Sequence, residues 1–438
     1  MFTYTEAVDY LDHHIGRGMH PGLDTIRGLL DLMGNPEDGY PIVHIAGTNG
    51  KTSVARMVTM LCIAHGLTTG TFTSPHLHRV EERVQLNGQV PEPEDFAQAV
   101  LDVKAFADIY EERTDRALSY FELTAALAFS WFADQAVDVG VIEVGLGGRL
   151  DATNAGHGTV SVLTSVGLDH TEELGDTLEL IAREKLAIVE PGSILIAGSL
   201  PDDVVAVVEE VCRERDVELR LFGRDFRIGG SAKAIGGWQL DVEGTQGVYE
   251  EIYLPLHGRY QTTNFAVAVA AVEALTGRKL NVEAVIEAAT VVTSPGRMEI
   301  LETEPPLLVD GAHNAQGFVA LAESLAEEYP TTRWVLVTGA MEDKDLSGMY
   351  GEIAGRLLAV VTTHIDSARA RTAADLGARL EPIVGDTPIV VVRDPVEALA
   401  HARTLVGEGD GILVAGSLYL VGAVRSHLTG EARTPNER

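Results

Sequence analysis

The sequence has very little cysteine and no long apolar run. Only Cys62 and Cys212 are cysteines among its 438 residues. Neither stands in a CxxC or Cys/His spacing, so the sequence offers no cysteine-based zinc site and we expect two small buried side chains. No apolar run approaches the roughly 18 residues of a membrane span, and the amino-terminal stretch lacks a basic segment leading into an apolar one. We therefore expect a cytoplasmic protein that does not associate with membranes.

Positive charge is also scarce. The chain has 33 Lys and Arg against 65 Asp and Glu, which gives a formal charge of −32. A surface of that sign repels phosphate backbones and anionic lipid headgroups, so we expect neither nucleic acid nor a membrane as a partner. Any anionic ligand must be bound by a local group of donors. The acid excess also suggests a salt-rich cytoplasm, in which case added salt should not lower solubility.

The apolar pattern predicts an α/β protein with two domains. Short β-rich runs alternate with amphipathic stretches up to about residue 215, which indicates a mainly parallel sheet covered by helices. In residues 225–256 an alternating residue pattern is interrupted by pairs of glycines, which predicts a small antiparallel insert. We expect a helix over 262–275 after it. Pro295 and Gly296 suggest a boundary between domains at 1–295 and 296–438. Strand and helix patterns resume after it, which predicts a smaller doubly wound, Rossmann-like domain.

One glycine-bounded turn predicts a phosphate-binding loop. The stretch "HIAGTNGKTS" runs from an apolar strand into a helix, so backbone N–H groups and a helix N-terminus point to one place, with a lysine beside them. Hydroxyls in the same stretch can bind Mg²⁺ or phosphate oxygens. The candidate nucleotide contacts are Gly47, Thr48, Asn49, Gly50, Lys51, Thr52 and Ser53.

Three polar residues at predicted strand ends are further candidates. Glu143 ends an apolar strand, where an unpaired charge would be costly, and we expect His170 to close the next strand in the same position. Ser74 follows another short strand. Open α/β sheets bind ligands at the carboxyl ends of their strands, so the three side chains should surround one crevice beside the loop. Taken singly, a buried structural acid explains Glu143 as well as a metal ligand does, a lone histidine such as His170 is more often structural than a ligand, and Ser74 is ambiguous in the same way.

Several longer motifs, in this order along the chain, resemble one family, the folylpolyglutamate synthase and dihydrofolate synthase branch of the Mur ligase superfamily. The segments that carry the resemblance are "HIAGTNGKTS", "FTSPHL", "SYFELTAALAF", "EVGLGGRLDATN", "TSVGLDHTEELGDTLELIAREKLAIVEPG", "GRYQTTNFAVAVAAV", "SPGRMEI" and "LLVDGAHN". The resemblance implies a P-loop-type central domain that binds ATP and the pterin, and a C-terminal ligase domain on the glutamate side.

The resemblance also implies a reaction and its metal site. In that family ATP phosphorylates a carboxylate, and the α-amine of L-glutamate displaces the phosphate to form an amide. Ser74, Glu143 and His170 are then implied as ligands of two Mg²⁺ ions, with Lys51 on the β and γ phosphates and His170 in the catalytic group. Lys185 is implied to be carbamylated and to help organise the second metal, although its spacing alone fits a solvated helix lysine.

The remaining implied contacts belong to the substrates. The pterin side takes Ser119, Tyr120, Phe121, Glu122, Leu150, Asp151 and Ala152, with aromatic core packing as the alternative for the two rings. Nucleotide contacts outside the loop are Asn264, Arg297 and Asp310, so ATP would be shared between the domains. The expected partners are ATP, L-glutamate and dihydropteroate or a reduced folate, bound by a monomer.

Two other readings compete with this one. A muropeptide ligase adds an amino acid to a UDP-linked precursor, but only 43 residues precede His44, fewer than its uridine-binding domain needs. A P-loop ATPase that drives binding partners would release phosphate without glutamate. Its only support is the loop.

Overall fold

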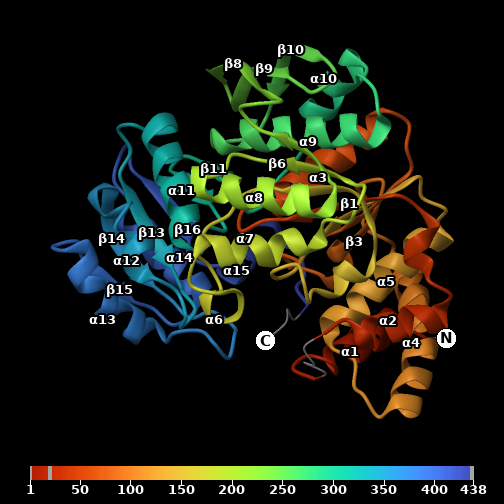
Figure 1. Ribbon diagram of the computed structural model, residues 1–438. Helices are drawn as coiled ribbons and strands as arrows, with labels where there is room; N and C mark the ends of the chain where they lie inside the picture. The colour runs from red at the N-terminus through yellow and green to blue at the C-terminus, as the bar shows by residue number, and fades with distance from the viewer. Residues whose placement is uncertain (1, 18–21, 435–438) are drawn as a thin grey trace.

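The structure, a computed structural model, describes residues 2–17 and 22–434 and has three β-sheets with helices packed on them (Figure 1). The strands are β1 (Ile42–Ala46), β2 (Thr69–Phe72), β3 (Val84–Leu86), β4 (Val139–Glu143), β5 (Gly158–Leu163), β6 (Ile194–Ala197), β7 (Glu218–Leu221), β8 (Arg227–Ala234), β9 (Gly237–Glu243), β10 (Val248–Leu254), β11 (Glu299–Thr303), β12 (Pro306–Val309), β13 (Trp334–Thr338), β14 (Leu357–Thr362), β15 (Ile389–Val391) and β16 (Gly411–Ala415). The helices are α1 (Tyr4–Asp12), α2 (Asp24–Met33), α3 (Lys51–Ala64), α4 (Pro93–Thr114), α5 (Tyr120–Asp134), α6 (Thr171–Leu174), α7 (Leu178–Lys185), α8 (Asp202–Arg215), α9 (Tyr260–Thr276), α10 (Val282–Val291), α11 (Ala315–Glu328), α12 (Leu346–Tyr350), α13 (Ala373–Val384), α14 (Pro395–Leu405) and α15 (Leu418–Thr429). The predicted α/β class is confirmed.

The first sheet has seven strands in the order β3-β2-β4-β1-β5-β6-β7. All neighbours pair in parallel except β3, which runs antiparallel to β2. Every residue of β1 and β4 is buried, because helices cover both faces of the sheet, and this explains the continuous apolar runs. β1 is central, with β4 on one side and β5 on the other, so the loops that leave these three strands are neighbours.

The side chains of alternate residues of β1 point to opposite faces of this sheet. Val43 and Ile45 belong to the core that contains α3 and α9. Ile42 belongs to the core that contains α1, α2, α4 and α5, and His44 points to that same side, toward Thr153. The strand that delivers the glycine loop is thus fixed from both faces.

The predicted insert is an antiparallel meander of β8, β9 and β10. It packs on α9, so that this helix lies between two sheets (Figure 1). A helix buried on all sides must be apolar on all sides, which explains the Ala and Val pattern of "FAVAVAAV".

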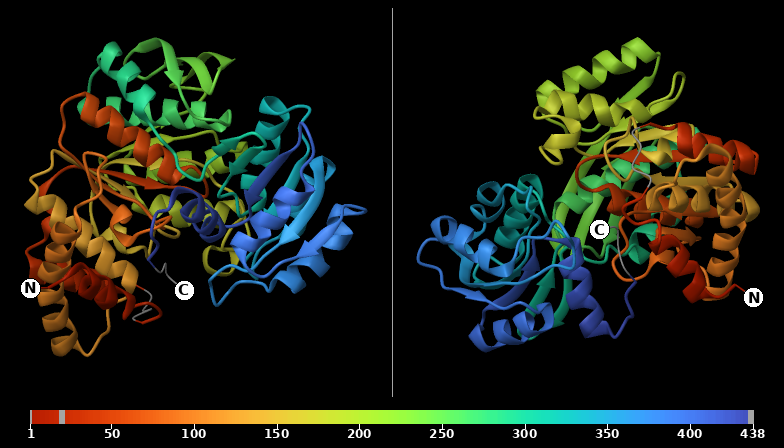
Figure 2. Two further views of the ribbon diagram at one scale, coloured as in Figure 1. Left: turned by 180° about the vertical axis from the view of Figure 1, so that it is seen from behind. Right: turned by 90° about the horizontal axis from the view of Figure 1, so that it is seen from below.

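The second part of the chain forms a six-stranded sheet in the order β11-β12-β16-β13-β14-β15. It is parallel except for β11, which pairs antiparallel with β12. The link between α10 and β11 contains Pro295 and Gly296. Most of this unit lies on the opposite side of the first sheet from α1, α2 and α4 (Figure 2). In the described ranges no helix has the length and apolar character needed to cross a membrane.

Candidate active site

The loop that joins β1 to α3 is held in shape by its glycines and by the chain after β5. Gly50 has φ +86° and directly precedes α3, while Gly47 has φ +156°. A Cβ at Gly47 would lie 1.9 Å from Thr164 Oγ1, so this position requires glycine. Thr164 Oγ1 also donates a hydrogen bond to Asn49 O (2.6 Å). These contacts therefore define the conformation of the loop.

The N-terminus of α3 carries the positive charge of the loop. Lys51 is the first residue of α3, and its Nζ donates to Gly47 O (3.1 Å) and Thr48 O (3.4 Å). No side chain caps the first turn of α3, so its N–H groups and Lys51 together suit an anion such as phosphate. Ser53 is buried, and its hydroxyl is hydrogen-bonded to Ser294 Oγ (3.0 Å).

Glu143 lies beside this loop, as the last residue of β4. It is 1% exposed. Its Oε1 accepts a hydrogen bond from Thr52 Oγ1 (2.9 Å), and its Oε2 accepts one from Ser74 N (3.3 Å). Burial raises the pKa of Glu143, and the charge of Lys51 opposes that rise. Lys51, Ser74 and Glu143 are thus brought together.

This arrangement suits Mg²⁺ that is also bound by phosphate oxygens. Within residues 2–17 and 22–434 no group of three acidic, His or Cys side chains gathers around one point. Mg²⁺ commonly takes one or two protein carboxylates and completes its shell with water and phosphate. A buried carboxylate next to the Thr52 hydroxyl and Ser74 meets that requirement.

The expected position of His170 is wrong. β5 ends at Leu163, and His170 lies beyond it as the residue that precedes α6, with φ +50°. β1 also lies between β4 and β5, so the strand that ends at Glu143 and the strand that precedes the His170 loop are not neighbours in the sheet. Asp169 is the acid nearest to His170 (Nε2–Oδ1, 4.0 Å), and the described residues record no contact between His170 and Glu143. The alternation of residues along an apolar run does not reveal at which residue the strand ends, so the end of β5 could not be placed from the sequence.

Lys185 is not a solvated helix lysine. It ends α7, is 4% exposed, and its Nζ donates to Gly47 O (3.2 Å). Burial, followed by the charge of Lys51, lowers its pKa to about 7. A Cβ at Gly148 would lie 2.9 Å from Lys185 O, so the glycine-rich loop after β4 needs glycine to pass the end of α7. The amine of Lys185 therefore lies against the first glycine loop and its backbone carbonyl lies against the second, and a pKa of about 7 leaves the amine largely neutral near pH 8.

The two segments predicted for the pterin side meet at Gly145, two residues after Glu143. A Cβ at Gly145 would lie 2.5 Å from Phe121 Cζ and 3.1 Å from Asp151 Oδ2. Asp151 Oδ2 accepts a hydrogen bond from Leu146 N (2.8 Å). An aromatic ring and a carboxylate are thus placed beside the end of β4, where the predicted phosphate and metal groups also lie.

A buried chain of hydrogen bonds connects Asp151 to β1. Thr153 Oγ1 donates to Asp151 Oδ1 (2.5 Å), and His44 Nε2 lies 2.9 Å from Thr153 Oγ1. Because the hydroxyl proton points to the carboxylate, His44 Nε2 must carry the proton of its own hydrogen bond. Burial lowers the pKa of His44 to about 3, so this imidazole is neutral. It links β1 to Asp151 through Thr153.

Other residues predicted for the pterin side have structural contacts. Ser119 and Glu122 form a capping box at the start of α5, in which each side chain accepts a hydrogen bond from the backbone N–H of the other. Tyr120 is buried, as is Ala152, and Leu150 is 41% exposed. Phe121 and Asp151 are the members of these segments that meet at the end of β4.

The three residues predicted to bind the nucleotide outside the loop come from three elements. Asn264 of α9 lies against the loop, with Oδ1 3.0 Å from a Cβ built at Gly50. Asp310 follows β12; burial raises its pKa and the charge of Arg297 opposes this. The charge of Arg297 also opposes the rise that burial causes in the pKa of Glu143. The charge of Arg297 therefore acts on one carboxylate of each unit, Glu143 of the first and Asp310 of the second.

Sequence reasoning missed three charged residues. Arg56 lines a cleft with Thr52 and Arg297, and burial lowers its pKa. Its spacing of four residues from Thr52 places both on one helix face, a signal that could have identified it. Asp169 and Lys344 form a buried ion pair between the two units (Nζ–Oδ1, 2.5 Å). No local pattern indicates that pair, because its partners are far apart in sequence.

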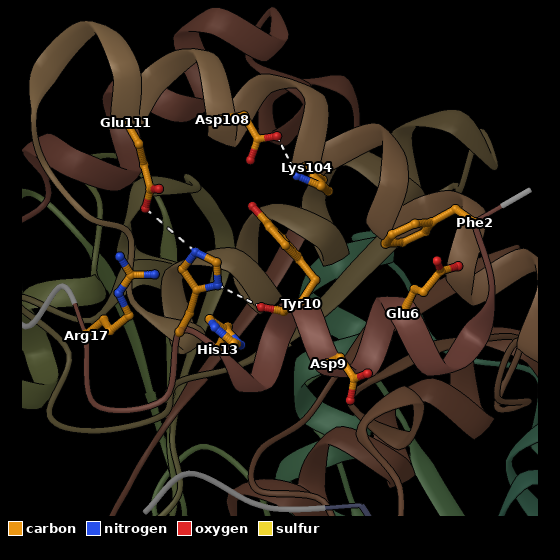
Figure 3. Close-up of a pocket in the computed structure, with 10 residues that line it drawn as sticks. Phe2, Glu6, Asp9, Tyr10, His13, Arg17, Lys104, Asp108 and Glu111 are labelled. Carbon is orange, nitrogen blue, oxygen red and sulfur yellow. Dashed lines mark hydrogen bonds and ion pairs between the residues drawn. The ribbon is translucent and has the colours of Figure 1, made fainter.

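A cavity of about 470 Å³ lies between α1 and α4 (Figure 3). Four acidic side chains line it against two that are always cationic, Lys104 and Arg17; Lys104 is paired with Asp108, and His14 lies beside Glu111. None of the predicted site residues lines it. An anionic substrate therefore has little to bind there.

Comparison with known proteins places this geometry in a family. The family described as "Mur ligase middle domain" matches residues 45–272, and "Mur ligase, glutamate ligase domain" matches residues 296–418. The dihydrofolate synthase/folylpolyglutamate synthase of Mycobacterium tuberculosis is 35% identical over 436 residues, which cover 93% of this chain and 90% of that protein.

Solved structures agree with the sequence relatives. The folylpolyglutamate synthase of M. tuberculosis, complexed with ADP and AMPPCP, superposes with a TM-score of 0.93 at 34% identity, covering 97% of this chain and 99% of that chain. Escherichia coli FolC in complex with DHPP and ADP gives a TM-score of 0.84 at 27% identity, covering 98% of both chains. The chain therefore belongs to the Mur ligase family, in the branch of the dihydrofolate synthases and folylpolyglutamate synthases.

Proposed function

We propose that this protein is an ATP-dependent ligase that joins L-glutamate to dihydropteroate, to a reduced folate, or to both, through an acyl phosphate. One observation carries the proposal. The glycine loop with Lys51, the Glu143 carboxylate, and the Phe121 and Asp151 wall adjoin one another at the carboxyl ends of β1 and β4. A phosphate site next to an aromatic wall is what phosphorylation of a pterin-linked carboxylate requires.

The loop and its neighbours act on the nucleotide. The N–H groups of the first turn of α3 and the Lys51 ammonium bind the β and γ phosphates and offset the charge that develops during transfer. Asn264 lies against the loop on one side, and Arg297 and Asp310 approach from the second unit. ATP is then held between the two units, and their approach excludes water from the acyl phosphate.

Glu143 is the residue that would hold Mg²⁺, with the Thr52 hydroxyl and Ser74 beside it. When bound, the ion neutralises phosphate charge during transfer. His170, in the loop after β5, would hold a second ion. The charge of Lys51 and the hydrogen bonds from Thr52 and Ser74 favour the ionised form of Glu143.

Lys185 is proposed to be carbamylated. Its amine is buried and has a pKa of about 7, so a large fraction is neutral at physiological pH and can attack CO₂. The N–C bond forms, one proton leaves, and the product carries a negative charge close to Lys51. The carbamate N–H can still donate to Gly47 O, the present partner of Lys185 Nζ.

A matrix of substrates tests the function. Phosphate release from MgATP is measured with dihydropteroate and with tetrahydrofolate, each with and without L-glutamate, and the products are weighed by mass spectrometry. We expect release that needs both a pterin acid and glutamate, together with a product heavier by one glutamyl residue. Phosphate release that needs neither compound would instead support a P-loop ATPase. The monomeric state and the cytoplasmic location stay predictions.

A further inference from the structure

Asp169 accepts hydrogen bonds from two donors of the second unit, Lys344 and Asn314, and His313 lies beside them. It lies in the loop after β5, next to His170, and its side chain is 8% exposed, while that of Lys344 is 7% exposed. Lys344 Nζ lies 2.5 Å from Oδ1, Asn314 Nδ2 donates to Oδ2 (2.8 Å), and His313 Nε2 lies 3.5 Å from Oδ2. These donors come from the loops after β12 and β13, so one side chain joins two separate sheets.

The same contacts continue into the glycine loop. Asn314 Nδ2 also donates to Asn49 Oδ1 (3.1 Å), and Asn49 Nδ2 donates back to Asn314 Oδ1 (3.2 Å) and to Gln316 Oε1 (2.9 Å). A Cβ at Gly167 would lie 2.5 Å from Gln316 Oε1, so the two units are in close contact here. The position of the second unit therefore decides how the Asn49 side chain of the loop is held.

We propose that Asp169, Lys344 and Asn314 form a latch that holds the second unit against the glycine loop, with Lys344 as a positioning residue for the ligase reaction. The proposal rests on the proposed function. Loss of Lys344 leaves a buried carboxylate without its counter-charge, which favours separation of the units because Asp169 then regains water. A lower closed fraction weakens nucleotide binding in proportion and admits water to the acyl phosphate.

Lys344→Met and Asp169→Asn in the full chain test the latch. The readouts are the kcat for amide formation, the ratio of phosphate released to amide formed, and the affinity for ADP. We expect the kcat of each variant to fall at least about tenfold and the ratio to rise from near one to at least about three, because water competes with glutamate. Loss of stability alone would lower both rates together and leave the ratio unchanged.

Lys104→Met is the matched control, since Lys104 also pairs with an aspartate at 2.5 Å but on the surface of α4. It should keep the wild-type ratio. The double variant Asp169→Asn/Lys344→Met should lose less than the sum of the two single effects, because it buries no unpaired charge.

Three results overturn the latch: an unchanged ratio in folded Lys344→Met, additive losses in the double variant, or the same rise in ratio for Lys104→Met. If Lys344→Met does not fold, Asp169→Asn decides by the same ratio. If the wild type forms no amide, the proposed function fails, and the latch is then judged by ADP binding alone. Weakening by about tenfold in Lys344→Met supports it and equal affinity overturns it.

Discussion

Lys185 allows a quantitative test by pH and CO₂. The difference between the ordinary lysine value of 10.5 and its pKa of about 7 corresponds to roughly 5 kcal/mol against the charged amine. At pH 8 about nine-tenths of this amine is neutral, roughly 300 times the neutral fraction of an ordinary lysine. Burial is the largest cause of the lowered pKa of Lys185. Half of this amine should be neutral near pH 7, and the neutral fraction should rise above that pH.

The assay follows the recovery of a decarbamylated enzyme. The protein is held in CO₂-free buffer at low pH, and the return of ligase activity is then timed at one fixed concentration of dissolved CO₂. The rate of return should rise about tenfold between pH 6 and pH 8 and stay nearly flat from pH 8 to pH 9. Lys185→Ala should not recover, whereas the surface variant Lys279→Ala should behave as wild type.

Two outcomes would refute this reasoning. A recovery rate that still climbs about tenfold from pH 8 to pH 9 would mean that the reacting lysine has an ordinary pKa. Full activity in Lys185→Ala would remove this residue from the mechanism.

Three further predictions follow from burial and hydrogen bonding. Glu143→Gln keeps an acceptor for Thr52 but loses the charge, so Mg²⁺-dependent phosphate release should fall at least about 100-fold; a loss within about threefold would contradict the assignment. Thr153→Val leaves the buried His44 Nε2–H without a partner, while Asp151 Oδ1 keeps its hydrogen bond from the backbone N–H of residue 153, so the free energy of unfolding in urea should fall by about 1–3 kcal/mol, against less than about 1 for Thr153→Ser; equal effects would deny the hydrogen-bond chain. Burial raises the pKa of the Cys62 and Cys212 thiols to about 12 and about 11, so a disulfide reagent should label neither without denaturant, and rapid labelling of the native protein would show that they are accessible.

The strand periodicity and the turn residues predicted the sheets and the glycine loop because those signals are local. The run before Gly47 became a central parallel strand, and the Gly-paired stretch at 225–256 became the meander over α9. Glu143 was placed correctly at the end of its strand because the apolar run stops there.

The rest depends on contacts between distant segments. Nothing near Lys185 in sequence indicates that it lies under Gly47, which is 138 residues away. The pair Asp169 and Lys344 spans 175 residues and exists only because two sheets meet. His170 was misplaced because β5 ends earlier than its apolar run suggests. Ser119 and Glu122 could have been recognised as a capping box from their spacing alone.

We propose that ATP activates a carboxylate beside the carboxyl ends of β1 and β4, where Lys51 and Phe121 lie. Transfer of ¹⁸O tests this most directly, with dihydropteroate labelled in its carboxylate oxygens and turned over with unlabelled ATP and L-glutamate. If an acyl phosphate forms, its bridging oxygen comes from the carboxylate and leaves with the phosphate when the amine attacks the carbonyl carbon. We predict one ¹⁸O in the phosphate for each amide formed, whereas unlabelled phosphate released with normal amide formation would contradict the account.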